Sequence, residues 1–304
     1  MKKVISGLLI LSMLFTVACG KSDLPESDAG IEAPPSAIEV QPVINEPETP
    51  EDDSESSEPE ETPQITNEEI ILVAKHRVRI NGVGSFPSFR MECYFVTNKE
   101  TREAIIIDPG GEADMLMQML KENGLKPVAI LLTHSHYDHI GAAEELRAAF
   151  DIPVYAWIDE KDYFGDSYYD FDESFNGNIV ANNITWLDDE DTPLEIAGFS
   201  VRAIHTPGHT AGSACYYIES ESILFSGDTM YRLSSTAINA NTGGDNSALI
   251  DTYLNKLYTL PDETRIYPGH GDNTNIGFEK ENNSMNLNWL ISIMSVENEE
   301  LIVE

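Results

Sequence analysis

The sequence predicts a mixed α+β domain, and two patterns support that fold class. Short apolar runs bounded by Gly, Pro or polar residues are typical of buried strands. Up to about residue 152 these runs alternate with stretches of helical periodicity, whereas the strand pattern dominates beyond it. The hydrophobic fraction of 41% is ordinary for a globular protein, so the 304-residue chain can bury a sizeable core.

The individual elements follow from these patterns. The segment after Asp108-Pro109-Gly110-Gly111 carries its apolar residues in helical register, and Gly124 stands where a helix commonly stops. We expect helices at residues 112–123, 142–150 and 248–259, with a further one at about 286–295. We expect strands at residues 70–74, 93–96, 104–107, 128–132, 154–156, 184–186, 199–204, 213–218, 223–225 and 265–267.

Three segments of different composition divide the chain. Residues 1–18 place Lys2 and Lys3 before an apolar stretch, which is typical of a signal peptide and short for a membrane span. Residues 19–66 are rich in Pro, Glu, Asp and Ser, with Lys21 the only base, and this composition predicts a disordered acidic tether. We expect residues 67–304 to form the folded domain.

The end of the signal segment has a motif of its own. Thr16-Val17-Ala18-Cys19-Gly20 resembles the lipobox of bacterial lipoprotein signal peptides, although Thr16 stands where leucine is usual. The resemblance implies lipidation of Cys19 and an extracytoplasmic protein anchored in the membrane at the bacterial cell surface. Several acyl chains, at about 0.8 kcal/mol per buried methylene, would hold it there stably. The alternative is an ordinary secretory signal with an incidental cysteine.

Charge and cysteine content limit the partners of the protein. The formal charge of −35 repels nucleic acid phosphates and anionic lipid headgroups. We therefore expect no nucleic acid partner, and membrane contact only through the N-terminal lipid anchor. Cys93 and Cys215 lie in strand-like runs, where we expect small core side chains; the sequence leaves open whether they pair, as it does the oligomeric state.

Histidines gather at the ends of the predicted strands. Six of the seven histidines follow a strand directly, and aspartates accompany them. Loops at strand ends are where a rigid sheet presents functional groups side by side. We therefore expect convergence of the side chains of His134, His136, Asp138, His139, His205, His209, Asp228 and His270.

These residue types suit metal ions. Neutral imidazole and carboxylate groups bind zinc at about 2 Å, and a site that keeps a position open for water lowers the pKa of that water to about 7. A single histidine in a turn is usually a capping or exposed residue. Four such groups within residues 134–139 are different, because clustering them without a metal costs stability through repulsion and desolvation. Five histidines and two aspartates are enough ligands for two metals.

The motifs together resemble a known family. T-H-S-H-Y-D-H-I-G, followed by T-P-G-H-T-A-G-S, F-S-G-D-T and Y-P-G-H-G, is similar to the metallo-β-lactamase superfamily in its glyoxalase II-like branch. The resemblance covers about residues 70–283. It implies a four-layer αβ/βα sandwich with the metals at one edge of two sheets, and two divalent metal ions, zinc or else iron or manganese.

The resemblance also implies roles for individual residues. Asp138 and Asp228 would be the catalytic carboxylates, and Asp228 would bridge the two metals. Asp108 matches a position that orients ligand imidazoles, and we expect a similar orienting or structural role for His209. One metal would be held by His134, His136 and His205, and the other by Asp138, His139 and His270.

The same motifs bear on the substrate. His139 and Asp228 favour a dinuclear hydrolase over the true β-lactamases, which commonly carry Arg and Cys there, and His136 argues against the flavodiiron branch. We expect a metal-bound hydroxide to hydrolyse an ester or thioester of a small molecule. Glutathione recognition is left open, because only 34 residues follow His270 and Ser234-Ser235-Thr236-Ala237 replaces the expected Gly-Arg or Gly-Lys pair.

Three alternative functions fit the sequence. A lactonase or β-lactamase-like hydrolase suits an extracellular location. A persulfide dioxygenase of the same superfamily would use a single iron held by two His and an Asp. A non-catalytic zinc-binding surface lipoprotein would bind metal without turnover. Metal content and turnover distinguish the four functions.

Overall fold

The computed structural model describes residues 71–80, 89–164, 181–238, 240–286, 288 and 290. The predicted signal peptide, Cys19 and the predicted tether lie outside these residues, as does most of the helix expected at 286–295. Among the helices of the described part, none is long and apolar enough to cross a membrane.

The first half of the described chain forms a six-stranded sheet in the order β1-β2-β3-β4-β5-β6. The pairs β1–β2 and β2–β3 are antiparallel, and the pairs from β3 to β6 are parallel. Parallel neighbours need a crossover, and the helices α1 (Ala113–Glu122) and α3 (Ala143–Phe150) supply two of them. The strands are β1 (Ile71–Ile80), β2 (Phe89–Asn98), β3 (Glu103–Ile107), β4 (Lys126–Leu131), β5 (Val154–Trp157) and β6 (Thr185–Leu187).

The second half forms another six-stranded sheet in the order β14-β13-β10-β9-β8-β7. Among its described strand pairs, β10–β13 alone is parallel, and the helix α4 (Asn246–Asn255) connects these two strands. A short ribbon of β11 (Met230–Tyr231) and β12 (Ser234–Ser235) follows β10, and the helix α5 (Ile276–Asn282) ends the fold. The strands are β7 (Leu194–Ile196), β8 (Phe199–His205), β9 (Ala214–Ile218), β10 (Ile223–Gly227), β13 (Arg265–Pro268) and β14 (Thr274–Asn275).

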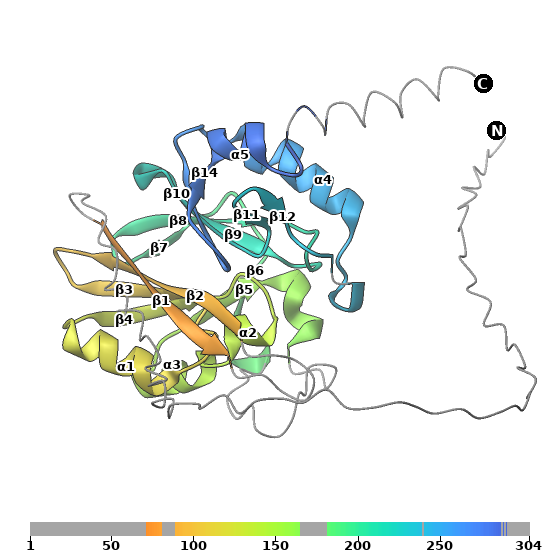
Figure 1. Ribbon diagram of the computed structural model, residues 1–304. Helices are drawn as coiled ribbons and strands as arrows, with labels where there is room; N and C mark the ends of the chain where they lie inside the picture. The colour runs from red at the N-terminus through yellow and green to blue at the C-terminus, as the bar shows by residue number, and fades with distance from the viewer. Residues whose placement is uncertain are drawn as a thin grey trace, which may run out of the picture. The chain divides into compact units, whose positions relative to one another are not determined.

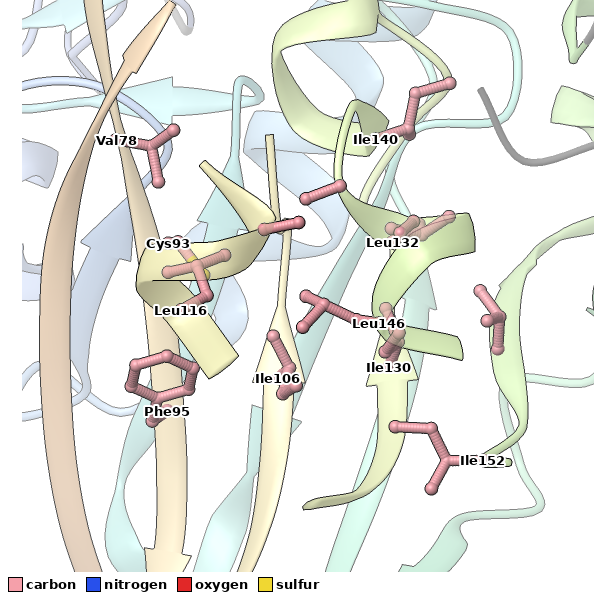
Figure 2. Close-up of a cluster of buried hydrophobic side chains, with 14 of the residues drawn as sticks. Val78, Cys93, Phe95, Ile106, Leu116, Ile130, Leu132, Ile140, Leu146 and Ile152 are labelled. Atoms are coloured by element: carbon pink, nitrogen blue, oxygen red, sulfur yellow. The ribbon is translucent and has the colours of Figure 1, made fainter. Parts of the chain in front are cut away.

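Alternating side chains bury both faces of each sheet. In β2, Cys93 and Phe95 face α1 and α3, whereas Tyr94 and Val96 face the other sheet. Figure 2 shows Leu116 of α1 among the side chains of that outer layer. The second sheet alternates likewise, and α4 and α5 cover its outer face (Figure 1). Two sheets between two helical layers are the predicted four-layer αβ/βα sandwich, and the predicted fold is confirmed.

Cys93 and Cys215 lie in different layers. Cys93 belongs to the core under α1 and α3, and Cys215 belongs to the core under α4. Both are buried free thiols, and burial raises the pKa of Cys215 to about 11. They therefore act as small core side chains, and they form no disulfide with each other.

Some elements differ from the expectation. The histidine-rich turn contains one helical turn, α2 (Tyr137–Ile140), and the short strands β7 and β14 were not predicted. The predicted helix 248–259 divides into α4 and a 3₁₀ turn at Leu257–Thr259. Such short elements carry too few residues for a periodic pattern.

The turn after β3 packs directly on α2. Asp108 has a positive φ of 49°, and the amide of Ala142 donates to the carbonyl of Pro109 at 2.8 Å. A Cβ atom on Gly110 would overlap the carbonyl oxygen of Asp138. Glycine at position 110 therefore allows the two backbones to touch, which fixes the histidine-rich turn against the end of β3.

We expect Gly110→Ala to lower the free energy of unfolding by about 3 kcal/mol, because backbone atoms must move to admit the methyl group. Gly124→Ala is the control: its φ is +60°, but nothing lies within 4 Å of the added Cβ. Its cost should be only the backbone strain, about 1 kcal/mol. Urea titration of both variants measures the difference. Equal losses would show that the contact at Gly110 is not tight.

Candidate metal centre

Seven histidine and aspartate side chains converge at the carboxyl ends of β4, β8, β10 and β13. They form two groups, and the ligand atoms within each group lie within 4.8 Å of one another. All are buried except His270, whose side chain is 29% exposed and marks the side that opens to solvent. The first group is His134, His136, His209 and Asp228; the second is Asp138, His139 and His270.

In the first group, three ring nitrogens face a common point. His136 Nδ1 lies 2.9 Å from His134 Nε2 and 2.9 Å from His209 Nε2. The nitrogens that face outward have partners in the protein. His209 Nδ1 donates to the carbonyl of Ala237 at 2.6 Å, and His136 Nε2 lies 3.4 Å from the Thr242 hydroxyl. Protons held on the outer nitrogens leave the lone pairs pointing inward, as metal ligation requires.

A buried carboxylate orients members of both groups. Asp108 Oδ2 accepts a hydrogen bond from His139 Nδ1 at 2.9 Å and from the Thr133 hydroxyl at 2.6 Å. Because Thr133 donates to Asp108, its oxygen accepts from His134 Nδ1, which lies 3.0 Å away. His270 Nδ1 donates to the carbonyl of Arg90 at 3.1 Å. Each of these histidines therefore presents Nε2 to the cluster.

Asp228 lies between the two groups. Its Oδ2 is 3.7 Å from His209 Nε2 and 3.6 Å from His270 Nε2, and its Oδ1 is 3.3 Å from His139 Nε2. Among the described residues, His139 Nε2 and Asp228 Oδ1 are buried atoms without a hydrogen-bond partner. Orphaned buried ligand atoms are costly unless another group satisfies them. The donor set fits bound metal ions, with Asp228 in reach of both groups.

Burial and charge act differently on the two groups. Burial and the neighbouring imidazoles hold the pKa of His134 well below its usual value, and burial and His209 lower the pKa of His136 to about 3. Burial alone would also lower the pKa of His139, but Asp228, Asp138 and Asp108 outweigh it and raise that pKa. The first group thus offers neutral imidazoles, and the second combines imidazole with carboxylate charge.

The structure corrects the prediction that His205 completes the first group. The ring of His205 stacks on Trp157 at a centroid distance of 4.9 Å, and its Nε2 donates to the carbonyl of Ala211 at 2.9 Å. His205 is the last residue of β8, and the two-residue period of the strand places it on the same face as Val201 and Ala203, which face the first sheet. The following turn carries His209 into the cluster instead.

A signal in the sequence distinguishes the two histidines. His209 follows Pro207 and Gly208, just as His270 follows Pro268 and Gly269. Gly208 has a φ of 148°, and its Cβ would overlap Leu249 of α4, so this turn requires glycine. The repeated Pro-Gly-His pattern marks the histidines whose backbone is held in a tight turn, and His205 lacks it.

A four-layer αβ/βα sandwich with such a cluster at the carboxyl ends of its strands defines a metal-binding protein of the metallo-β-lactamase fold. The chain belongs to the metallo-beta-lactamase superfamily, whose family model matches residues 92–270. The superfamily predicted from the motifs is confirmed.

Relatives and solved structures agree with this membership. The chain is 36% identical over 193 residues to "Probable metallo-hydrolase YqgX" of Bacillus subtilis (strain 168), covering 62% of this chain and 89% of the relative. It is 33% identical over 198 residues to "Hydroxyacylglutathione hydrolase GloC" of Haemophilus influenzae (strain ATCC 51907 / DSM 11121 / KW20 / Rd), covering 64% of this chain and 92% of the relative.

Two crystal structures are similar over most of the described chain. The structure of "BLEG-1 B3 metallo-beta-lactamase" has a TM-score of 0.59 and 35% sequence identity, covering 70% of this chain and 100% of that one. The structure of "TTHA1623 in a di-iron-bound form" has a TM-score of 0.56 and 32% identity, covering 69% of this chain and 98% of that one.

We expect His209→Ala to lower the number of bound metal ions per chain by one, because it removes one of three converging ring nitrogens. His205→Ala is the matched control and should keep the full number, since its Nε2 is bonded to the carbonyl of Ala211. Metal analysis of both purified variants after dialysis makes the comparison. Loss of metal in His205→Ala alone would restore the original assignment.

Proposed function

We propose that this protein is a metal-dependent hydrolase that binds two divalent metal ions and cleaves an ester or thioester of a small molecule. The observation that carries the proposal is the position of Asp228, whose two oxygens reach toward both ligand groups. A carboxylate shared by two ligand groups is the arrangement that a dinuclear site needs. Zinc suits the imidazole-rich donor set, and iron or manganese are alternatives.

The ligand residues of this chain would form two sets, one for each ion. His134, His136 and His209 would hold one ion, Asp138, His139 and His270 the other, and Asp228 would bridge them. Such ions, when bound, supply an acidified water as nucleophile and a Lewis acid for the substrate carbonyl. Asp108 fixes the tautomer of His139, so the imidazole cannot rotate away.

Tyr231 has a place beside this centre. Its ring lies edge-on to His270 at a centroid distance of 6.0 Å. Burial and the Asp228 charge raise the pKa of Tyr231 well above its usual value. The phenol therefore keeps its proton at neutral pH and lies beside the centre as a neutral O–H group.

The relatives support a hydrolase. One is described as a probable metallo-hydrolase and another as a hydroxyacylglutathione hydrolase, and the alignments cover nearly their full lengths. A solved relative with two bound irons supports room for two ions. The segment Ser234–Ala237 departs from the glutathione-binding pattern, so we propose a thioester or ester substrate without committing it to glutathione.

β-Lactam hydrolysis is a second candidate. The observation that favours it is the similarity to a solved structure described as a B3 metallo-beta-lactamase, at 35% identity over the whole of that chain. Turnover of a chromogenic β-lactam, compared with turnover of a thioester under the same conditions, separates the two candidates.

We expect the wild-type chain to bind two ions and to hydrolyse S-lactoylglutathione as a model thioester. Asp228→Asn should lower kcat/KM at least about 100-fold and reduce metal occupancy, because the amide cannot bridge two cations. Asp114→Asn, an exposed change on α1, is the control and should leave both unchanged. Full activity in Asp228→Asn would disprove the bridge. One iron per chain, with oxygen consumption on a persulfide and no hydrolysis, would favour a dioxygenase.

We also propose that residues 1–18 are a lipoprotein signal peptide and that acylated Cys19 anchors the mature chain at the cell surface through the tether of residues 19–66. Radioactive fatty acid should label the wild-type protein in the membrane fraction. Cys19→Ser should remove the label, because it removes the thiol that is acylated, whereas Ser22→Ala should keep it. Label retained in Cys19→Ser would contradict the anchor.

A further inference from the structure

Glu160 is a fully buried carboxylate outside the ligand set. It lies in the 3₁₀ helix η1 (Ile158–Tyr163), which follows β5, and none of its surface is exposed. Burial raises its pKa, as expected for an acid withdrawn from water. Burying a carboxylate costs free energy unless hydrogen-bond donors surround it. The donors to Glu160 therefore indicate its role.

Those partners belong to two loops that carry histidines. Glu160 Oε2 accepts from the backbone amide of Ser135 at 2.9 Å. Glu160 Oε1 accepts from the backbone amide of Gly212 at 3.0 Å and from the hydroxyl of Thr210. Ser135 stands between His134 and His136, and Thr210 follows His209. One carboxylate thus joins the backbone segments that carry all three imidazoles of the first group.

The loop after His209 packs tightly against η1. A Cβ atom on Gly212 would overlap the backbone nitrogen of Glu160, so the loop after His209 rests directly on η1. The Thr210 hydroxyl also lies 2.6 Å from the Ser213 hydroxyl, which extends the network along the same loop. Ligand loops held by a packed, hydrogen-bonded anchor keep their ring positions within a few tenths of an ångström.

The second group has different anchors. His139 is held by Asp108, and His270 is held by the carbonyl of Arg90. Neither anchor involves Glu160, whose oxygens accept from the first-group loops. A change at Glu160 should therefore act on one ligand group more than on the other.

We propose that Glu160 is a positioning residue for a single metal ion, because it sets the spacing of the ring nitrogens of His134, His136 and His209. Zinc–nitrogen bonds of about 2.0–2.1 Å leave little tolerance in that spacing. Glu160 acts through the two loops and touches neither the metal nor the substrate. The inference deepens the proposed function and rests on it.

Glu160→Gln in the full chain tests the role. The amide has nearly the same volume, but its NH₂ group must face either the Ser135 amide or the Gly212 amide, both of which are donors. The affinity of one of the two zinc sites should fall about 10–100-fold while the other site keeps its affinity. Competition titration of Zn²⁺ against a chromophoric chelator measures both affinities, and the absorption of bound Co²⁺ reports the geometry of the altered site.

Glu279→Gln is the matched control. Glu279 of α5 is also fully buried, and it accepts from the Leu233 amide, the Thr274 hydroxyl and the Asn283 side chain. This variant loses a comparable buried carboxylate whose donors are neither ligand residues nor next to one in the sequence. Both zinc affinities should stay at the wild-type value in it, even where its urea midpoint falls as much as that of Glu160→Gln.

Thr210→Val is a milder variant that keeps the test decisive if Glu160→Gln folds poorly. It removes one donor to Glu160 with little change in shape, and we expect a several-fold loss at the same single zinc site. Wild-type affinity at both sites in Thr210→Val and Glu160→Gln, or an equal loss at both sites, would overturn the proposal. If the wild-type chain binds zinc but hydrolyses no ester, the hydrolase proposal fails, and the zinc titration still decides the role of Glu160.

Discussion

The arrangement of the cluster depends on the hydrogen bonds that the carboxylate of Asp108 accepts. Asp108 Oδ1 accepts from the backbone amide of Thr133, and Oδ2 accepts from the Thr133 hydroxyl and from His139 Nδ1. One residue at the end of β3 therefore fixes the start of the histidine-rich turn and the ring of a histidine within it. Its left-handed backbone, with a φ of 49°, is a conformation that aspartate tolerates better than most residues. The buried charge is offset by three donors.

The histidine and aspartate cluster buries more polar side chains than an apolar core could hold without partners for them. His134, His139 and Asp228 are almost inaccessible to solvent, yet each is placed by contacts with its neighbours. Partly satisfied polar networks are costly, and fully satisfied ones rigidify a site. The orphaned Nε2 of His139 and Oδ1 of Asp228 show which atoms remain for a cation. The cost of burying these groups is thus linked to the ability to bind metal.

Much of the fold could be predicted, because buried strands are recognisable in the sequence as apolar runs. The helices α1, α3 and α4 are recognisable because their apolar residues recur with helical periodicity. The ligand positions were harder. His205 ends β8 and His209 follows four residues later, so only the pleat of the strand and the turn at Gly208 separate the directions of their side chains. Glu160 left no trace in the sequence, since it stands in the charged run Asp159-Glu160-Lys161-Asp162, which reads as an exposed surface. Its burial arises from contacts with residues 25 and 50 or more positions away.

The ligand groups draw on both sheets. In each group some donors follow β4 of the first sheet, and the others follow β8, β10 or β13 of the second. An ion held by either group is therefore a cross-link between the two halves of the sandwich, in addition to the apolar layer between them. Binding to the folded state alone stabilises it by about 4.1 kcal/mol at a thousandfold excess over Kd. Removal of the ions by a chelator therefore takes away a cross-link as well as a cofactor. The free energy of unfolding of this protein then depends on the concentration of free metal around it.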